Sequence, residues 1–392
     1  MQDLINELKA SVEGNRSELR QLADYIWENP ETAFKEVKAC AAQVELLKKA
    51  GFEVATPVYE QPTAYRVEVG DGAPVFAIAA EYDALPEVGH GCGHNLICTA
   101  SIGAFIAATA YMKAHGLPGK LVLLGTPAEE SGSGKVRMLS KGCLDGIDAV
   151  MMLHPGWRTS NDTGSTAIRR FDVEFHGKAA HAAGMPEDGI NALDAVHLLF
   201  DGINCYRQQM PEFTRIHGIV TNGGAAPNII PEKASARFFL RSNDEAWEDR
   251  LVERFKKIVE GAALMTGATY TLTPFSISCQ SRMPNAPMNA AYVAAAELVG
   301  LNPVVETKAG RGSSDFGNFS HACPGVHCYF GISEKKIPGH SVEMAKAAHS
   351  DYGFENTLRG AVAMAAVAIR FMQDGEFRAQ VAADFNEKTP RL

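Results

Sequence analysis

Three clusters of polar side chains in the sequence could hold a metal ion. Cys92 and His94 lie two residues apart in a glycine-flanked loop, where a flexible backbone can direct a sulfur and an imidazole nitrogen at one centre. Glu129 and Glu130 are adjacent, so in extended backbone one carboxylate can bind a metal while the other holds a water molecule. His154 follows the apolar run 150–153. Together the clusters supply thiolate, imidazole and carboxylate groups, the donor set of a transition-metal site.

Each of these residues also has a purely structural explanation. Cys92 could be a buried, inert cysteine and His94 a capping histidine. Adjacent acids such as Glu129 and Glu130 favour the positive end of a helix dipole. His154 could be a hydrogen-bonded core histidine. The occurrence of all the clusters directly after apolar runs favours the metal site over these explanations.

Buried strands of an α/β sheet are expected to position the clusters. The apolar runs 75–80, 121–125 and 150–153 are typical of such strands, and each leads into polar residues. Ligands of open α/β sheets bind beyond the carboxyl ends of the strands. The sequence predicts an α/β catalytic domain, residues 1–166 and 280–392, with a mixed sheet and helices on both faces. Its other expected elements are helices at 18–28, 38–50, 96–112, 290–299 and 356–372 and strands at 303–306 and 325–331.

The segment between these two parts has a different pattern. Residues 168–175 lean towards an alternation of polar and apolar side chains, as in a strand with one exposed face. The expected element order from there is β-α-β-β-α-β, which matches the ferredoxin-like motif. The sequence therefore predicts an inserted ferredoxin-like α+β domain at 167–279. Its expected strands are 168–175, 215–222, 234–241 and 268–278, and its expected helices are 191–209 and 244–264.

The composition disfavours several classes of function. The 392 residues include 37 Lys and Arg against 46 Asp and Glu, a formal net charge of -9 without a long basic run, so nucleic acid is not an expected partner. No apolar stretch approaches the roughly 18 residues of a membrane span, and the first residues lack a signal-peptide core. A cytoplasmic protein without a membrane partner is therefore expected. Eight scattered cysteines without a C-x-x-C pair indicate free thiols.

Seven motifs distributed nearly end to end resemble a family of dinuclear metallopeptidases and amidohydrolases. This family contains aminoacylase, hippurate hydrolase, auxin-conjugate hydrolases and p-aminobenzoyl-glutamate hydrolase (metallopeptidase family twenty, subfamily D). The resemblance implies hydrolysis of an amide C–N bond in a small N-acyl amino acid, aryl-amide or dipeptide-like substrate. The motifs are E-Y-D-A-L-P-E-V-G-H-G-C-G-H-N (81–95), P-A-E-E (127–130), L-H-P-G (153–156), H-G-K-A-A-H-A-A (176–183), P-N-I-I-P (227–231), S-S-D-F-G-N (313–318) and A-H-S-D (348–351).

The resemblance implies two divalent metal ions per subunit, zinc or manganese. Cys92 would bridge the two ions. Glu130 and His349 would complete one coordination sphere, and His94 and His154 would complete the other. Thiolate and imidazole suit zinc, while related enzymes often function with manganese. On the residues alone, His349 has an ordinary loop histidine as its alternative.

The same resemblance implies three residues that assist catalysis. Asp83 would orient a metal ligand, because a ligating imidazole needs its other nitrogen fixed. Glu129 would be the general base that takes a proton from the attacking water and returns it to the leaving amine. Members of the family dimerise through the inserted lid domain, so a homodimer or higher homo-oligomer is expected. His181 would then reach a partner's site and stabilise the oxyanion, with a surface loop histidine as the alternative.

Four residues are expected to bind the small-molecule substrate: Asn228, Arg241, Ser313 and Ser314. Arg241 could pair with a substrate carboxylate in a bidentate fork. Arg237 is the competing choice, and a salt-bridged strand end is the structural alternative. Residue 95 is Asn, where many hippurate-hydrolase-type relatives have Asp followed by His. This departure places the chain nearer the p-aminobenzoyl-glutamate and dipeptidase-like branch.

The sequence leaves two rival functions open. The first is hydrolytic removal of an amine from a non-peptide carbon, because the pocket, not the activated water, selects the electrophile. Nucleobase zinc deaminases are disfavoured, because their H-x-E and P-C-x-x-C signature is missing. The second rival is a metal- or ligand-binding homologue without turnover. Glu129 argues against it, since a pure binder needs no general base.

Overall fold

A computed structural model of the chain describes residues 2–308, 310 and 312–389. The described residues of Met1–Gly164, Arg282–Gly310 and Ser314–Leu392 form one compact unit, unit 1. Those of Ser165–Ser281 and Arg311–Ser313 form a second, unit 2. Unit 2 is thus an insertion in the chain of unit 1. All eight cysteines are free thiols, as the sequence predicted.

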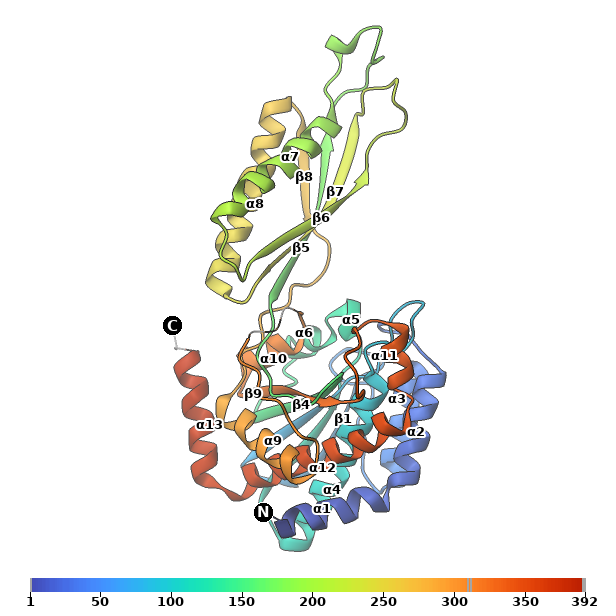
Figure 1. Cartoon of the computed structure of the whole chain (residues 1–392), viewed down its shortest axis with the longest axis vertical. Coiled ribbons are helices and arrows are strands. Elements are labelled where there is room, and N and C mark those ends of the chain that lie inside the picture. The colour runs from blue at the N-terminus through green and yellow to red at the C-terminus, as the bar shows by residue number, and fades with distance from the viewer. Residues whose placement is uncertain (1, 309, 311, 390–392) are drawn as a thin grey trace. The chain divides into compact units, whose positions relative to one another are not determined.

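Unit 1 is built on a mixed sheet with the strand order β1-β3-β2-β4-β9 (Figure 1). The edge strand β1 (Tyr65–Asp71) is antiparallel to β3 (Gly119–Gly125). The remaining strands, β2 (Val75–Ala80), β4 (Ala149–Gly156) and β9 (Gly325–Gly331), continue the sheet in parallel pairings. The carboxyl ends of β2, β3, β4 and β9 therefore meet at one edge, which confirms the predicted sheet and directs their following loops to one place.

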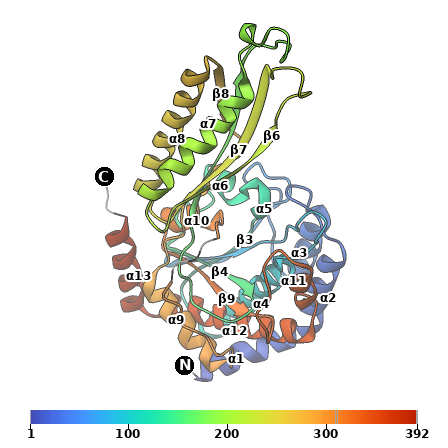
Figure 2. The ribbon, with the colours of Figure 1, turned by 45° about the horizontal axis from the view of Figure 1, so that its top comes forward.

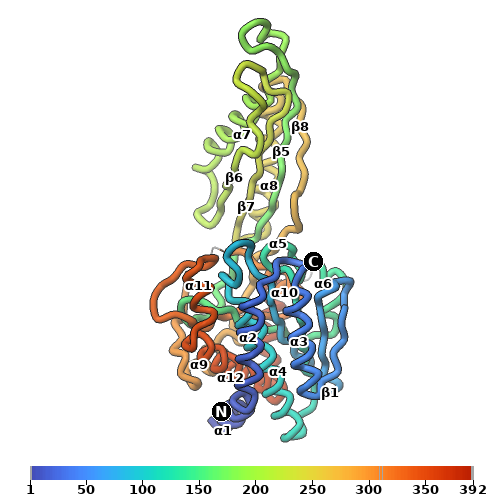
Figure 3. The backbone as a smooth tube through the Cα atoms, turned by 90° about the vertical axis from the view of Figure 1, so that its right-hand side faces the viewer, coloured from blue at the N-terminus to red at the C-terminus, as the bar shows by residue number. Residues whose placement is uncertain are grey.

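Alternating side chains of the sheet face two separate cores. Phe76 and Ile78 of β2 pack into a large core with the helices of one face, while Ala77 and Ala79 pack into a smaller core on the other face. The helices of the large core are α1 (Gln2–Gly14), α2 (Arg16–Glu28), α3 (Val37–Lys49), α4 (His94–His115), α9 (Ala286–Leu298), α12 (Asp351–Gln373) and α13 (Gly375–Lys388) (Figure 3). Those of the smaller core are α6 (Gly134–Leu139) and α10 (Phe316–Ala322). Helices on both faces of the sheet are thus confirmed.

Helix α4 lies at the centre of unit 1, packed against α12 and the sheet. It begins after Gly93, whose φ of 75° is in the left-handed region, and ends at Gly116 with a φ of 60°. Among the described residues it is the one helix long and apolar enough to span a membrane, but 89% of that window is buried. Such burial is typical of the core helix of a globular domain.

Unit 2 is a four-stranded antiparallel sheet with two helices on one face (Figure 2). Its elements follow the order β5 (Ala167–His176), α7 (Ala192–Tyr206), β6 (Arg215–Asn222), β7 (Lys233–Ser242), α8 (Glu245–Thr266) and β8 (Thr269–Pro274). The strand order β6-β7-β5-β8 is that of the ferredoxin-like fold, so this prediction is confirmed. Phe171, Val173 and Phe175 of β5 alternate into the core shared with the helices. The side chains of Asn191 and Asp244 cap α7 and α8.

Some local predictions were wrong or incomplete. The strand expected at 303–306 is only a single bridge between Ser160 and Val304, because Pro303 lacks an N–H donor and Val304 and Val305 are exposed. The sequence analysis had not predicted β1, α10, α13 or the short helix α11 (Val342–Ala347). These elements are an edge strand and short or peripheral helices, whose apolar patterns are the weakest.

Candidate metal centre

Loops that follow three parallel strands bring the predicted ligands together. Glu81 and Asp83 follow β2, and His154 lies in the last turn of β4. Glu129 and Glu130 begin the single-turn helix α5 (Glu129–Gly132), directly after β3. Within this region, several groups of three ligand atoms lie within 4.8 Å of one another. They are Cys92, His94 and His154; Cys92, Glu130 and His340; His94, Glu129 and Glu130; and Glu81, Glu129 and Asp315.

Asp83 fixes two of the predicted ligands at once. Its Oδ1 lies 3.0 Å from His94 Nδ1, and its Oδ2 accepts a hydrogen bond of 2.9 Å from the backbone N–H of Glu130. The Asp83 carboxylate is fully buried, and its bond to His94 offsets the effect of burial and lowers its pKa. With Nδ1 held by Asp83, the Nε2 atom of His94 is free to act as a ligand.

Three buried atoms converge without hydrogen-bond partners among the described residues. His94 Nε2 lies 3.5 Å from Glu81 Oε2 and 3.7 Å from Glu130 Oε1. None of the three atoms makes a hydrogen bond. Buried polar atoms are normally satisfied, so a converging set of unsatisfied acceptors calls for a cation. The donor set therefore fits a metal ion.

Cys92 and His154 lie on the other side of His94. Cys92 Sγ is 3.4 Å from His154 Nε2, and His154 Nδ1 donates to the carbonyl oxygen of Pro155 at 2.7 Å. Burial lowers the pKa of His154 to about 4, so the ring is neutral and its Nε2 lone pair is available. Burial, together with the Glu130 carboxylate, raises the pKa of the Cys92 thiol. A bound cation would be needed to hold Cys92 as a thiolate.

The structure replaces His349 by His340 as the fifth candidate ligand. His349 Nε2 lies 3.2 Å from Asp24 Oδ1, and its ring is stacked on Trp27 at a centroid distance of 4.1 Å. It belongs to none of the groups of converging ligand atoms among the described residues. His340 does, with its Nε2 3.6 Å from Glu130 Oε2. The assignment of His349 from the sequence is therefore wrong, because side chains of α2 hold that ring elsewhere.

Glu129 lies in a dense group of buried charges. Burial raises its pKa well above the usual value, and the Glu81 and Glu130 carboxylates raise it further. Beside it, the fully buried Lys135 ammonium pairs with Glu81 Oε1 and with Asp315 Oδ1, the latter at 2.8 Å. Lys135 thereby supplies the positive charge that a group of three buried carboxylates requires.

The sequence analysis missed Lys135, Asp315, His340 and the metal-facing role of Glu81. Glu81 and Asp315 both lie in motifs that were recognised, so their position was signalled but not their contacts. His340 precedes Ser341, whose side chain caps α11. That capping serine was the available sign that a histidine here sits at a fixed helix start. Lys135 gave no signal, because a lysine is almost never fully buried.

In unit 2, the two candidate arginines have different partners. Arg237 makes a bidentate ion pair with Asp172, at 2.6 and 2.8 Å, and its guanidinium lies 3.8 Å from the centroid of the Phe275 ring. Arg241 instead donates to Ser313 Oγ at 2.9 Å and to His217 Nε2 at 3.2 Å. Among the described residues Arg241 has no carboxylate partner. Arg241 is therefore the guanidinium that remains able to bind an anion.

The other predicted substrate and catalytic residues have the following positions. His181 is exposed, and its Nδ1 accepts from the N–H groups of Ala183 and Gly184 at 3.2 and 3.0 Å, so Nε2 carries the proton and can donate outward. The backbone carbonyl of Asn228 accepts from Ala182 N at 3.0 Å, and the Asn228 side chain is exposed. The Ser314 hydroxyl accepts from Phe316 N at 3.2 Å at the start of α10.

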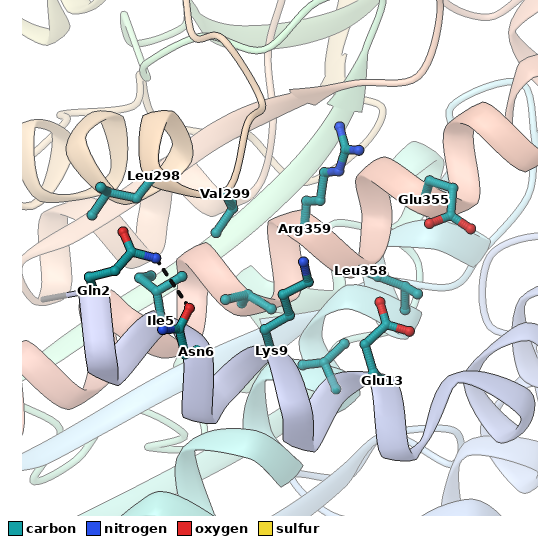
Figure 4. A pocket seen from close by; sticks show the side chains of 12 residues that line it. Gln2, Ile5, Asn6, Lys9, Glu13, Leu298, Val299, Glu355, Leu358 and Arg359 are labelled. Carbon is teal, nitrogen blue, oxygen red and sulfur yellow. Dashed lines mark hydrogen bonds between the residues drawn. The ribbon is translucent and has the colours of Figure 1, made fainter.

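A further pocket of unit 1 is remote in character from this centre. A cavity of about 220 Å³ is lined by α1, α9 and α12 (Figure 4). Its carboxylates, Glu13 and Glu355, both pair with Arg16, and its lining contains no histidine or cysteine. It lacks the donor atoms of a metal site.

Unit 1 therefore carries a centre that fits metal ions, with carboxylates beside it, at the carboxyl edge of an α/β sheet, which defines a metal-dependent hydrolase. The chain matches the model of peptidase family M20/M25/M40 over residues 77–370. It belongs to that family, and it is a metal-dependent amidohydrolase or peptidase.

Relatives with known names support this membership. The Xaa-Arg dipeptidase of Mus musculus is 34% identical over 366 residues, covering 90% of this chain and 85% of that protein. A p-aminobenzoyl-glutamate hydrolase polypeptide of Escherichia coli (strain K12) is 36% identical over 314 residues, covering 75% and 65%. A dinuclear metal-binding M20 peptidase from Bacillus subtilis shares the fold, with a TM-score of 0.69, 20% identity and coverage of 90% and 98%.

Proposed function

We propose that this protein hydrolyses the amide bond of a small dipeptide-like or N-acyl amino acid substrate, using two divalent metal ions, zinc or manganese. The observation that carries the proposal is the convergence of unsatisfied His94, Glu81 and Glu130 atoms beside the Glu129 carboxylate. Its relatives act on related bonds, as the names Xaa-Arg dipeptidase and p-aminobenzoyl-glutamate hydrolase state.

Five side chains would hold the ions: Cys92, His94, Glu130, His154 and His340. Cys92 belongs to groups with ligands on both sides and is therefore suited to bridge them. Bound metal lowers the pKa of water and polarises a carbonyl oxygen, which is the chemistry that amide hydrolysis needs.

Glu129 would act as the general base. Its carboxylate lies in the same group of atoms as the ligands His94 and Glu130. Burial and the neighbouring Glu81 carboxylate raise its pKa, so Glu129 can hold a proton taken from water. It would then deliver that proton to the nitrogen of the departing amine. Asp83 keeps His94 and the Glu130 backbone in place during this cycle.

Arg241 would bind the substrate carboxylate, and its replacement separates it from Arg237. Arg241→Ala is expected to raise KM for a carboxylate-bearing dipeptide by about 10-fold or more, because a charge-assisted hydrogen-bonded pair contributes roughly 1.5–3 kcal/mol. Arg237→Ala is the matched control, because that guanidinium already pairs with Asp172. Its expected effect is on melting temperature, with KM unchanged. Steady-state kinetics with the dipeptide and its C-terminal amide tests the assignment, and equal KM changes in both variants would contradict it.

Metal removal tests the proposed function as a whole. Dialysis against a chelator is expected to abolish hydrolysis of a panel of dipeptides, N-acyl amino acids and aryl-amides, since the activated water depends on the ions. Re-addition of zinc or manganese is expected to restore activity as two ions bind per chain, measured by elemental analysis. Full activity of a metal-free sample would rule the proposal out.

Assembly and compartment complete the proposal. We propose a cytoplasmic homodimer formed through unit 2, with no membrane or nucleic-acid partner. The proton on His181 Nε2, set by the two N–H donors at Nδ1, supports a role for His181 as an oxyanion donor in that dimer.

A further inference from the structure

Glu36, between α2 and α3, is a buried carboxylate with three hydrogen-bond donors. It has no exposed surface. Its Oε1 atom accepts from the backbone N–H of Phe34 and from that of Ala128, both at 2.9 Å. Its Oε2 atom accepts from the Thr63 hydroxyl at 3.2 Å. One side chain thus joins three segments of unit 1, one of which leads directly into Glu129.

The two backbone donors share an unusual conformation. Phe34 and Ala128 both have a φ of 61°, in the left-handed region that residues with a Cβ rarely adopt. Such a conformation persists only where surrounding contacts impose it. Glu36 supplies such a contact at both positions, through the same oxygen atom.

The turn after Ala128 is held at its other end by Phe34. A Cβ at Gly132 would lie 2.5 Å from the Phe34 ring and 2.6 Å from Ala128 Cβ, so the chain passes as closely as glycine permits. The carbonyl oxygen of Ala128 also accepts from the N–H groups of Gly132 and Gly134, at 3.1 and 3.2 Å. The single turn Glu129–Gly132 therefore has its start fixed by Glu36 and its end packed on Phe34.

We propose that Glu36 is a positioning residue that sets the direction of the Glu129 carboxylate. By holding the Ala128 N–H, Glu36 keeps the backbone before Glu129 in the left-handed conformation from which the carboxylate reaches its group of ligand atoms. The proposal rests on the proposed function, since it concerns the group assigned as general base. Glu36 itself belongs to no group of converging ligand atoms in the described chain.

Two substitutions at Glu36 test the role. Glu36→Ala removes the acceptor and is expected to lower kcat about 10- to 100-fold with KM and metal content unchanged, because a small misplacement of a reacting group costs about that factor. Glu36→Gln keeps an acceptor for both N–H groups, while the Thr63 hydroxyl can rotate to accept from the amide. Its kcat is expected to stay within about threefold of wild type.

Glu31 provides a matched control in the same loop. Its carboxylate accepts from the N–H groups of Lys38 and Ala39, at 2.8 and 3.0 Å, and so caps α3 without touching Ala128. Glu31→Ala is expected to lower the melting temperature with kcat unchanged. A purely structural role for Glu36 would give Glu36→Ala the same pattern, and that outcome would overturn the proposal.

A second-site change keeps the test decisive if Glu36→Ala folds poorly. Glycine adopts a positive φ without a Cβ penalty, so Ala128→Gly is expected to restore part of the lost kcat in the Glu36→Ala background. Wild-type kcat in Glu36→Ala, a kcat loss that tracks metal loss, or equal losses in Glu36→Gln and Glu36→Ala would each reject the positioning role. Failure of the proposed function is distinguishable, because Glu129→Gln would then retain activity whatever Glu36 does.

Discussion

Glu129→Gln is expected to lower kcat by about 10²- to 10⁴-fold, the range in which a positioned general base contributes. Glutamine has nearly the same shape but cannot take a proton from water. Metal content and melting temperature are expected to be unchanged, because the five candidate ligands and the Lys135 ion pairs with Glu81 and Asp315 all remain. Steady-state kinetics together with elemental analysis of the same sample measures both quantities.

The opposite outcome is equally clear for Glu129. A variant that turns over substrate at the wild-type rate would remove Glu129 as the base. A variant that loses activity and metal together would instead make Glu129 a ligand. Glu129→Asp adds a useful comparison, since it keeps a carboxylate but shortens its reach, and an intermediate kcat is expected.

His340→Ala is expected to lose metal, and His349→Ala is expected to retain it. His340 Nε2 lies in a group with Cys92 and Glu130, so its removal leaves one coordination sphere short of a donor. Loss of an outer partner of a metal site costs about 10- to 100-fold in affinity, and loss of a ligand costs at least as much. His349 forms a stack with Trp27 and a pair with Asp24, so its loss affects packing alone.

Competition with a chromogenic chelator measures both affinities on the same scale. The pair of variants is informative because the two histidines lie in one short stretch of unit 1 and flank α11. Weakened metal binding in His349→Ala with unchanged binding in His340→Ala would restore the assignment made from sequence. Loss in both variants would indicate that α11 as a whole supports the site.

The parts of the site that the sequence could predict are those set by local pattern. Cys92 and His154 were identified because each lies near the end of an apolar strand, and parallel strands direct their ends to one edge. His340 could not be distinguished from His349 in this way. Both lie in polar loops near short helices, and the deciding fact is that Trp27 and Asp24 of α2 occupy His349. That contact joins segments over 300 residues apart, and no local pattern encodes it.

The same limit explains the two arginines of β7. Arg237 and Arg241 alternate identically along one strand, so the sequence left both as candidates. The choice depends on Asp172 in the neighbouring β5, which pairs with Arg237 through the register of the two strands. The buried Lys135 is a similar case, because its partners Glu81 and Asp315 come from distant motifs.

The insertion of unit 2 fixes the order in which biosynthesis delivers the donors. Cys92, His94, Glu130 and His154 all precede residue 165, whereas His340 emerges only after residue 281 has been passed. A nascent polypeptide that has finished unit 2 still lacks the last histidine, and its Lys135 still lacks Asp315 as a counter-ion. Ions that arrive during translation meet an incomplete coordination sphere, so correct metal loading belongs to the final stage of synthesis.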